Sequence, residues 1–170
     1  MNDSKPSIPE ARTPADFYRP KGYQAQESVG YLMRRIVSSL SQEIDRRMED
    51  SGLTNAQWMP LMKLSSGAAN TVAELARVCE MDAGAMTRLL DRLEAKGLCR
   101  RERSSEDRRV VHLELTPEGA DAAKVIPAVL SQLQNECLAG FTTEEWHTLK
   151  SLLRRVLDNA LTLPPAEPKS

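Results

Sequence analysis

The feature that most constrains the fold is a change of period in the middle of the chain. On both sides of the middle, apolar residues recur every three or four positions, as in amphipathic helices. After Gly97 the spacing falls to two, since Val111, Leu113 and Leu115 alternate with polar residues. Segments 98–103 and 108–115 are therefore predicted to be strands of one hairpin. The fold class predicted is mainly α with a small β-hairpin.

Start and stop signals divide the helical parts. Thr54, Thr71 and Asp82 are predicted N-caps, and Glu74 completes a capping box with Thr71. Thr116-Pro117-Glu118 predicts a helix start with proline in the first turn, and Pro127 predicts a kink further along. The predicted helices span 27–50, 55–65, a short segment from 72 to about 79, 83–96, 117–139 and 143–161.

Two short helices, a three-residue turn and a hairpin follow one another in the order of a winged helix-turn-helix. We therefore predict a winged helix-turn-helix plus a helical dimerisation layer, without a transmembrane or signal segment. A cytoplasmic location is expected. The predicted regions are a flexible arm at 1–21, a helical dimerisation region at 22–52 and 117–163, a DNA-binding domain at 53–116 and a disordered tail at 164–170.

The charge is unevenly distributed. The whole chain carries a formal charge of -1, which by itself argues against a protein that coats nucleic acid. Residues 83–112, however, hold eight basic and five acidic side chains, a local charge of +3, and the rest of the chain carries -4. The excess of positive charge falls on the second short helix and the hairpin, where DNA contact is expected.

The outer face of helix 83–96 is predicted to read DNA. Arg88 is suited to a bidentate contact with a guanine edge, and hairpin arginines are suited to the minor groove. An alternative is a solvated helix face with ion pairs at helical spacing. The predicted DNA contacts are Thr71, Ala83, Thr87, Arg88, Arg92, Arg103, Ser104, Ser105, Asp107, Arg108 and Arg109.

The run DAGAMTRLLDRLEAKGL at 82–98, followed by DRRVVHLELT at 107–116, resembles the MarR family of bacterial winged helix-turn-helix transcriptional regulators. The resemblance extends over about residues 27–161, and the proline-rich arm is longer than the family minimum. It implies a two-fold dimer with intertwined outer helices on a pseudo-palindromic DNA operator. It also places Thr87, Arg88 and Arg92 on the recognition helix, and Asp107 and Arg109 in the wing.

A homodimer also follows from burial. The first and last two helices carry apolar stripes that a small winged-helix core cannot cover, so a second copy is expected to cover them. Glu43 and Arg47 project into the first stripe. They are either a partly buried pair that sets the dimer register or a snorkelling surface pair.

The resemblance further implies a repressor released by a small aromatic carboxylate, similar to salicylate, hydroxybenzoate or hydroxynicotinate. An apolar slot with an arginine suits a flat acid, because a guanidinium binds carboxylate in a bidentate manner. Alternatively, the apolar members are plain core and the arginines are solvated. The predicted ligand-binding residues are Tyr31, Arg34, Arg35, Ser38, Trp58, Met62 and His112.

Other functional classes are less well supported. Cys99 precedes two arginines, which suggests a lowered thiol pKa and a redox-sensing repressor as an alternative, whereas Cys79 and Cys137 occupy apolar positions. No nucleophile, base and orienting group can be assembled, and His112 and His147 lack ligands at metal spacing. We therefore expect no enzyme activity, metal or cofactor. A dimeric protein-interaction module without DNA binding is a distant alternative.

Overall fold

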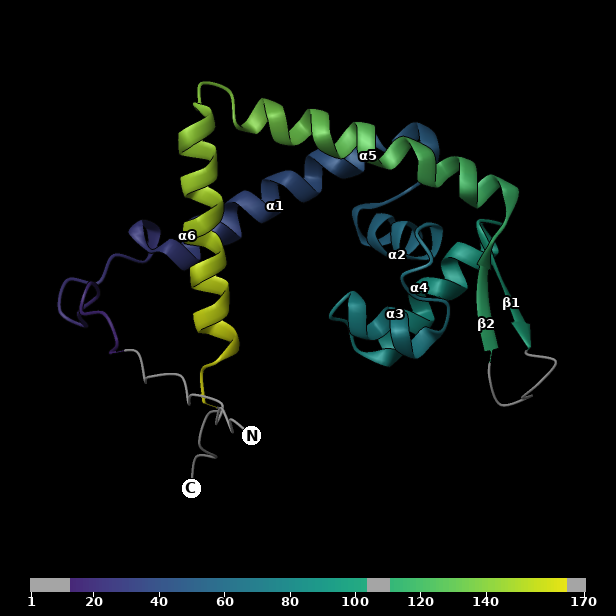
Figure 1. The fold of residues 1–170 in the computed structure, drawn as a ribbon, viewed down its shortest axis with the longest axis horizontal. Helices are drawn as coiled ribbons and strands as arrows, with labels where there is room; N and C mark the ends of the chain where they lie inside the picture. The colour runs from purple at the N-terminus through teal and green to yellow at the C-terminus, as the bar shows by residue number, and fades with distance from the viewer. Residues whose placement is uncertain (1–12, 104–110, 165–170) are drawn as a thin grey trace, which may run out of the picture. The chain divides into compact units, whose positions relative to one another are not determined.

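The computed structural model of the chain describes residues 13–103 and 111–164 (Figure 1). The chain divides into two compact units, Met1–Ser38 and Ser39–Ser170. The regular structure of the described ranges is helical apart from one two-stranded antiparallel sheet. The predicted fold class, mainly α with a β-hairpin, is confirmed.

In the first unit, the segment before the long helix supplies hydrogen-bond partners for that helix's N-terminus. A short 3-10 helix, Ala25–Glu27, leads into α1 (Val29–Arg47). The Ser28 hydroxyl accepts from the Tyr31 N–H at 3.2 Å, and the Tyr18 hydroxyl accepts from the Val29 N–H at 2.9 Å. Two of the amide groups that a helix start leaves unpaired are thereby satisfied.

In the second unit, the short helices are capped as the sequence predicts. They are α2 (Asn55–Ser65), α3 (Val72–Val78) and α4 (Ala83–Ala95). The Thr71 hydroxyl accepts from the Glu74 N–H at 3.2 Å, and the Asp82 carboxylate accepts from the Ala85 N–H at 2.8 Å. These caps fix where α3 and α4 begin.

The core of the second unit forms under α4. Its four apolar residues at helical spacing, Met86, Leu89, Leu90 and Leu93, are each at most 1% exposed. They pack in one cluster with residues of α1, α2, α3, the hairpin and α5. The Lys96 ammonium, just after α4, donates to the Gly52 carbonyl at 2.6 Å and to the buried Gln57 amide oxygen at 3.0 Å. These bonds tie the end of α4 to the start of α2.

The hairpin consists of β1 (Cys99–Arg103) and β2 (Val111–Leu115), paired antiparallel with Cys99 opposite Leu115. Of the predicted second strand, 108–110 lie outside the described residues. The other edge of β2 reaches the start of α3, where the Leu113 N–H donates to the Asn70 carbonyl at 2.7 Å. Leu113 itself is buried in the core, so the hairpin is attached to the helix-turn-helix on two sides.

Two long helices complete the second unit, α5 (Pro117–Cys137) and α6 (Thr143–Leu161), and α6 has the bounds that the sequence predicts. The structure assigns α5 as one helix that includes Pro127. None of the residues of α6 is buried, and no helix in the described ranges is long and apolar enough to cross a membrane. The apolar side chains of α6 that stay exposed are Trp146, Leu152, Leu153, Val156, Leu157 and Leu161.

An ion-pair network joins the end of α1 to the end of α5. The Arg47 guanidinium pairs with Glu43 at 2.7 Å on its own helix and also with Glu136 of α5. The Arg47 side chain is 20% exposed and that of Glu43 28%. The predicted Glu43–Arg47 pair is therefore present and partly buried, and its role in dimer register stays a prediction.

Candidate DNA-binding surface

The helix-turn-helix is closed by a tight turn between α3 and α4. Glu80 adopts a left-handed conformation with a φ of 53°, which non-glycine residues rarely adopt. The Met81 N–H then donates to the Ala76 carbonyl at 2.8 Å, which completes a Schellman-type end of α3. This turn sets where α4 begins.

The outer face of α4 carries the predicted contact residues. Thr87, Arg88 and Arg92 are exposed, as is Ala83 at the first turn. The Thr87 hydroxyl donates to the Ala83 carbonyl at 2.8 Å, so only its acceptor lone pairs remain for a ligand. In the described part of the chain, neither Arg88 nor Arg92 forms a salt bridge.

Arg101 of β1 determines the charge of this face. Its guanidinium pairs with Asp91 at 2.7 Å and also with Glu94, the two acidic residues of α4. The Arg101 amide adds a hydrogen bond to Glu94 at 3.3 Å. The alternative of helix-spaced ion pairs along α4 is therefore wrong for the described residues, because Asp91 pairs across to the hairpin. Sequence reasoning missed this role of Arg101, although two acids three residues apart on α4 were a signal.

The other predicted contacts divide into three groups. Thr71 is half-buried, and its hydroxyl is engaged as the cap of α3, whereas Arg103 is exposed at the end of β1. Arg100, beside Arg103 in sequence, is paired with Glu102 and Glu114. The predicted wing-tip contacts lie outside the described residues, and they are Ser104, Ser105, Asp107, Arg108 and Arg109.

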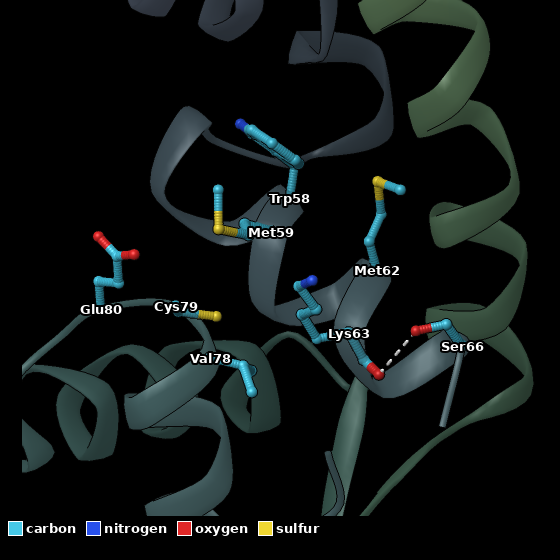
Figure 2. A pocket seen from close by; sticks show the side chains of 8 residues that line it. All are labelled: Trp58, Met59, Met62, Lys63, Ser66, Val78, Cys79 and Glu80. Atoms are coloured by element: carbon cyan, nitrogen blue, oxygen red, sulfur yellow. Dashed lines mark hydrogen bonds between the residues drawn. The ribbon is translucent and has the colours of Figure 1, made fainter. Parts of the chain in front are cut away.

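A pocket of about 510 Å³ opens between α2 and the turn that follows α3 (Figure 2). Two predicted ligand residues, Trp58 and Met62, line it, but His112 does not. His112 lies on β2, where its buried Nδ1 has no hydrogen-bond partner among the described residues. The volume lies within the roughly 300–1,000 Å³ typical of small-molecule sites.

The remaining predicted ligand residues belong to α1 in the first unit and are Tyr31, Arg34, Arg35 and Ser38. The Arg34 guanidinium lies 5.4 Å from the centre of the Tyr31 ring, a cation–π distance. Arg34 and Arg35 are both exposed, as expected for solvated arginines. Their participation in a ligand site stays a prediction.

Sequence reasoning missed six residues that line the pocket: Met59, Lys63, Ser66, Val78, Cys79 and Glu80. Met59, Lys63 and Ser66, on α2 and at its end, could have been predicted, because residues at spacings of three and four share one helix face with Trp58 and Met62. Val78, Cys79 and Glu80 reach the pocket only through the packing of α3 beside α2, which no local pattern indicates.

The alternative of a reactive Cys99 is wrong. Cys99 is 3% exposed, and burial raises the pKa of its thiol to about 11, with the Glu94 carboxylate acting in the same direction. Arg101 alone favours the thiolate, and its effect is smaller. Cys79 is half-buried and Cys137 is exposed, so the prediction of an apolar setting fails for Cys137 in this chain.

Comparison with known proteins identifies relatives of this chain. Residues 53–111 match the model of the MarR family. The chain is 34% identical over 128 residues to the multiple antibiotic resistance protein MarR of Escherichia coli (strain K12). That match covers 72% of this chain and 89% of the relative.

Two solved complexes have similar structures. A mutant of MarR from E. coli complexed with operator DNA is 32% identical, with a TM-score of 0.69 over 76% of this chain and 93% of that chain. The MepR–DNA complex of S. aureus has a TM-score of 0.73 and covers 78% of this chain and 98% of that chain. At 23% identity, this second likeness shows the winged-helix fold alone.

Proposed function

The chain belongs to the MarR family, and on that premise we propose that it is a sequence-specific DNA-binding transcriptional regulator. The observation that carries the proposal is the outer face of α4. Arg88 and Arg92 are exposed there, while both acids of the same helix are engaged in ion pairs with Arg101. This face presents two arginines that have no acidic partner among the described residues, which suits contact with phosphates and base edges. Of the two relatives solved with DNA, the MarR mutant from E. coli is bound to its operator.

The test is a DNA titration by fluorescence anisotropy, with operators selected from a random duplex library. Arg88→Ala is expected to relax base preference by roughly 1–3 kcal/mol at one position, and Arg109→Ala to weaken binding to all sequences. Lys124→Ala is the matched control, because Lys124 is an exposed cation of α5 paired with Asp121. A DNA affinity that changes neither with salt concentration nor with either arginine substitution would contradict the proposal.

We infer that the working form is a homodimer bound to a pseudo-palindromic operator. Support comes from the apolar stripe of α6, on which Leu157 is 55% and Leu161 71% exposed. A monomer would leave this stripe in water, whereas a second copy removes it from water. Sedimentation velocity tests the inference: the wild type should exceed 18.9 kDa, and Leu157→Glu should shift it towards that mass. A wild type that sediments only as the monomer would contradict it.

We further propose that the regulator is a repressor released by a small aromatic carboxylate. The pocket beside Trp58 and Met62 supports a flat apolar ligand, and Lys63 supplies a cation for its acid group. A thermal-shift screen of salicylate, hydroxybenzoates and hydroxynicotinates, followed by a DNA-release assay, tests this step. A compound that stabilises the protein must also bind the DNA-free form better in order to release DNA.

A further inference from the structure

The pocket between α2 and the helix-turn-helix turn carries two opposite charges. Lys63 contributes an ammonium group from α2, and Glu80 contributes a carboxylate from the turn (Figure 2). In the described ranges, the two side chains form no salt bridge with each other or with another residue. The rest of the lining is mostly apolar and comprises Trp58, Met59, Met62 and Val78, together with Cys79 and the polar Ser66.

From this arrangement we infer that the pocket takes an aromatic zwitterion, a ring that carries both a carboxylate and an ammonium group. The carboxylate would pair with Lys63 and the ammonium with Glu80, while the ring would lie against Trp58 and the methionines. A ligand with a single charge would leave one of the two side chains unpaired beside it. The inference rests on the proposed regulatory function and narrows its ligand class.

The backbone of Glu80 adds a second, independent observation. Glycine is the usual residue in a left-handed helix end, yet Glu80 holds this conformation at a φ of 53°. A non-glycine residue held in a disfavoured conformation beside a pocket is a reason to look for a function of its side chain. Because Glu80 belongs to the turn before α4, a ligand bound to Glu80 would contact the segment that leads into the N-terminus of the recognition helix.

The opposite wall of the pocket is held in place by hydrogen bonds. The Trp58 indole N–H donates to the Asn55 amide oxygen at 3.2 Å. Asn55 is bonded in turn to α1, since its amide nitrogen donates to Ser41 at 3.1 Å and its backbone N–H donates to Asp45 at 2.6 Å. The indole therefore forms a fixed wall of the pocket. A ligand that shifts the opposite wall, the turn that carries Glu80, would shift α4 with it.

Three compounds of one shape separate the charges. The probe is 4-(aminomethyl)benzoate, and the controls are 4-methylbenzoate, which lacks the ammonium, and 4-methylbenzylamine, which lacks the carboxylate. Binding to the full-length protein is measured by calorimetry and by thermal shift. We expect each control to bind about five-fold more weakly than the zwitterion, which corresponds to about 1 kcal/mol per ion pair.

Two substitutions assign the charges to their partners. Lys63→Met should lower affinity for the zwitterion and for 4-methylbenzoate but not for 4-methylbenzylamine. Glu80→Gln should lower affinity for the zwitterion and for 4-methylbenzylamine but not for 4-methylbenzoate. Equal affinity of the wild type for all three compounds, or no measurable binding of the zwitterion, would overturn the inference. Glu80→Gly, which relieves the backbone conformation, should keep the fold and lose the ammonium preference, so a failure to fold cannot be mistaken for lost binding.

A failure of this inference can be told apart from a failure of the proposed function. DNA binding by the ligand-free protein depends on α4 and the hairpin, and it is measured without any compound. If that binding is present and the zwitterion shows no preference, only the inference is wrong. If the zwitterion binds as expected and the protein does not bind DNA, only the proposed function is wrong.

Discussion

A single methyl group at Gly119 is expected to separate α5 from the end of the recognition helix. A Cβ built on Gly119 would lie 1.7 Å from the Leu98 carbonyl oxygen and 2.7 Å from the Leu98 carbonyl carbon. An ordinary carbon–oxygen contact needs roughly 3.3 Å, so the first turn of α5 would have to retreat by about 1.6 Å. The Leu98 carbonyl is a backbone group and the new Cβ is bonded directly to the backbone, so no side-chain rotation relieves the clash.

The retreat would break two hydrogen bonds. The Thr116 N–H donates to the Leu98 carbonyl at 3.2 Å, and the Thr116 hydroxyl donates to the Gly97 carbonyl at 2.6 Å. Their loss costs about 1 kcal/mol each, and overpacking adds roughly 1–3 kcal/mol. The helix propensity of alanine returns at most about 1 kcal/mol. Gly119→Ala should therefore lower the free energy of unfolding by about 2–4 kcal/mol.

Urea unfolding at one fixed protein concentration measures this change, because an associating protein has a concentration-dependent stability. Gly84→Ala is the matched control, since Gly84 also lies in the first turn of a helix. Its Cβ would meet side-chain atoms rather than backbone, at 3.3 Å from the Asp82 carboxylate that caps α4 and 3.5 Å from the Arg88 guanidinium. The control should change stability by about 1 kcal/mol or less. A Gly119→Ala protein as stable as the wild type would refute the packing argument.

Three further predictions follow from named groups. Arg46 and Arg47 lower the pKa of Glu43 from 4.5 to about 2, so stability present above pH 4.5 should be lost as the pH falls towards 2, and Glu43→Gln should flatten that loss in acid unfolding curves. Arg101→Met should weaken DNA binding about five-fold in anisotropy titrations, and adding Asp91→Asn and Glu94→Gln should restore it. Cys99 should resist a thiol reagent until the protein unfolds, so Cys99→Ser should leave the number of native-state labels unchanged in mass spectra.

The helix ends could be predicted from the sequence because caps act within three or four residues. Thr71 and Asp82 each accept from the amide three positions on, and the helices begin where these residues predict. The buried face of α4 could also be predicted from the sequence, because its apolar residues recur at helical spacing. The first helix ends at Arg47 rather than near residue 50, because a 3-10 turn at Glu49–Ser51 leads into left-handed Gly52.

The parts of the site that could not be predicted depend on contacts between elements. Lys63 and Glu80 face one pocket only because α3 packs beside α2, and the spacing of 17 residues has no local meaning. The close approach of Gly119 to Leu98 likewise requires α5 and the hairpin to be placed in space. Position in the chain identifies a helix face, but not which second element lies against that face.

The charge of the recognition helix is set by a residue outside it. By sequence, α4 carries Arg88, Arg92 and two acids, a formal balance of zero that would not attract phosphate. Arg101 of β1 pairs with both acids and brings the balance of the helix and its partner to +1, so Arg88 and Arg92 are the charges left without an acidic partner among the described residues. The same two ion pairs hold the hairpin against α4, and a change that moves the hairpin would uncover the carboxylates. Wing position and helix charge are therefore coupled.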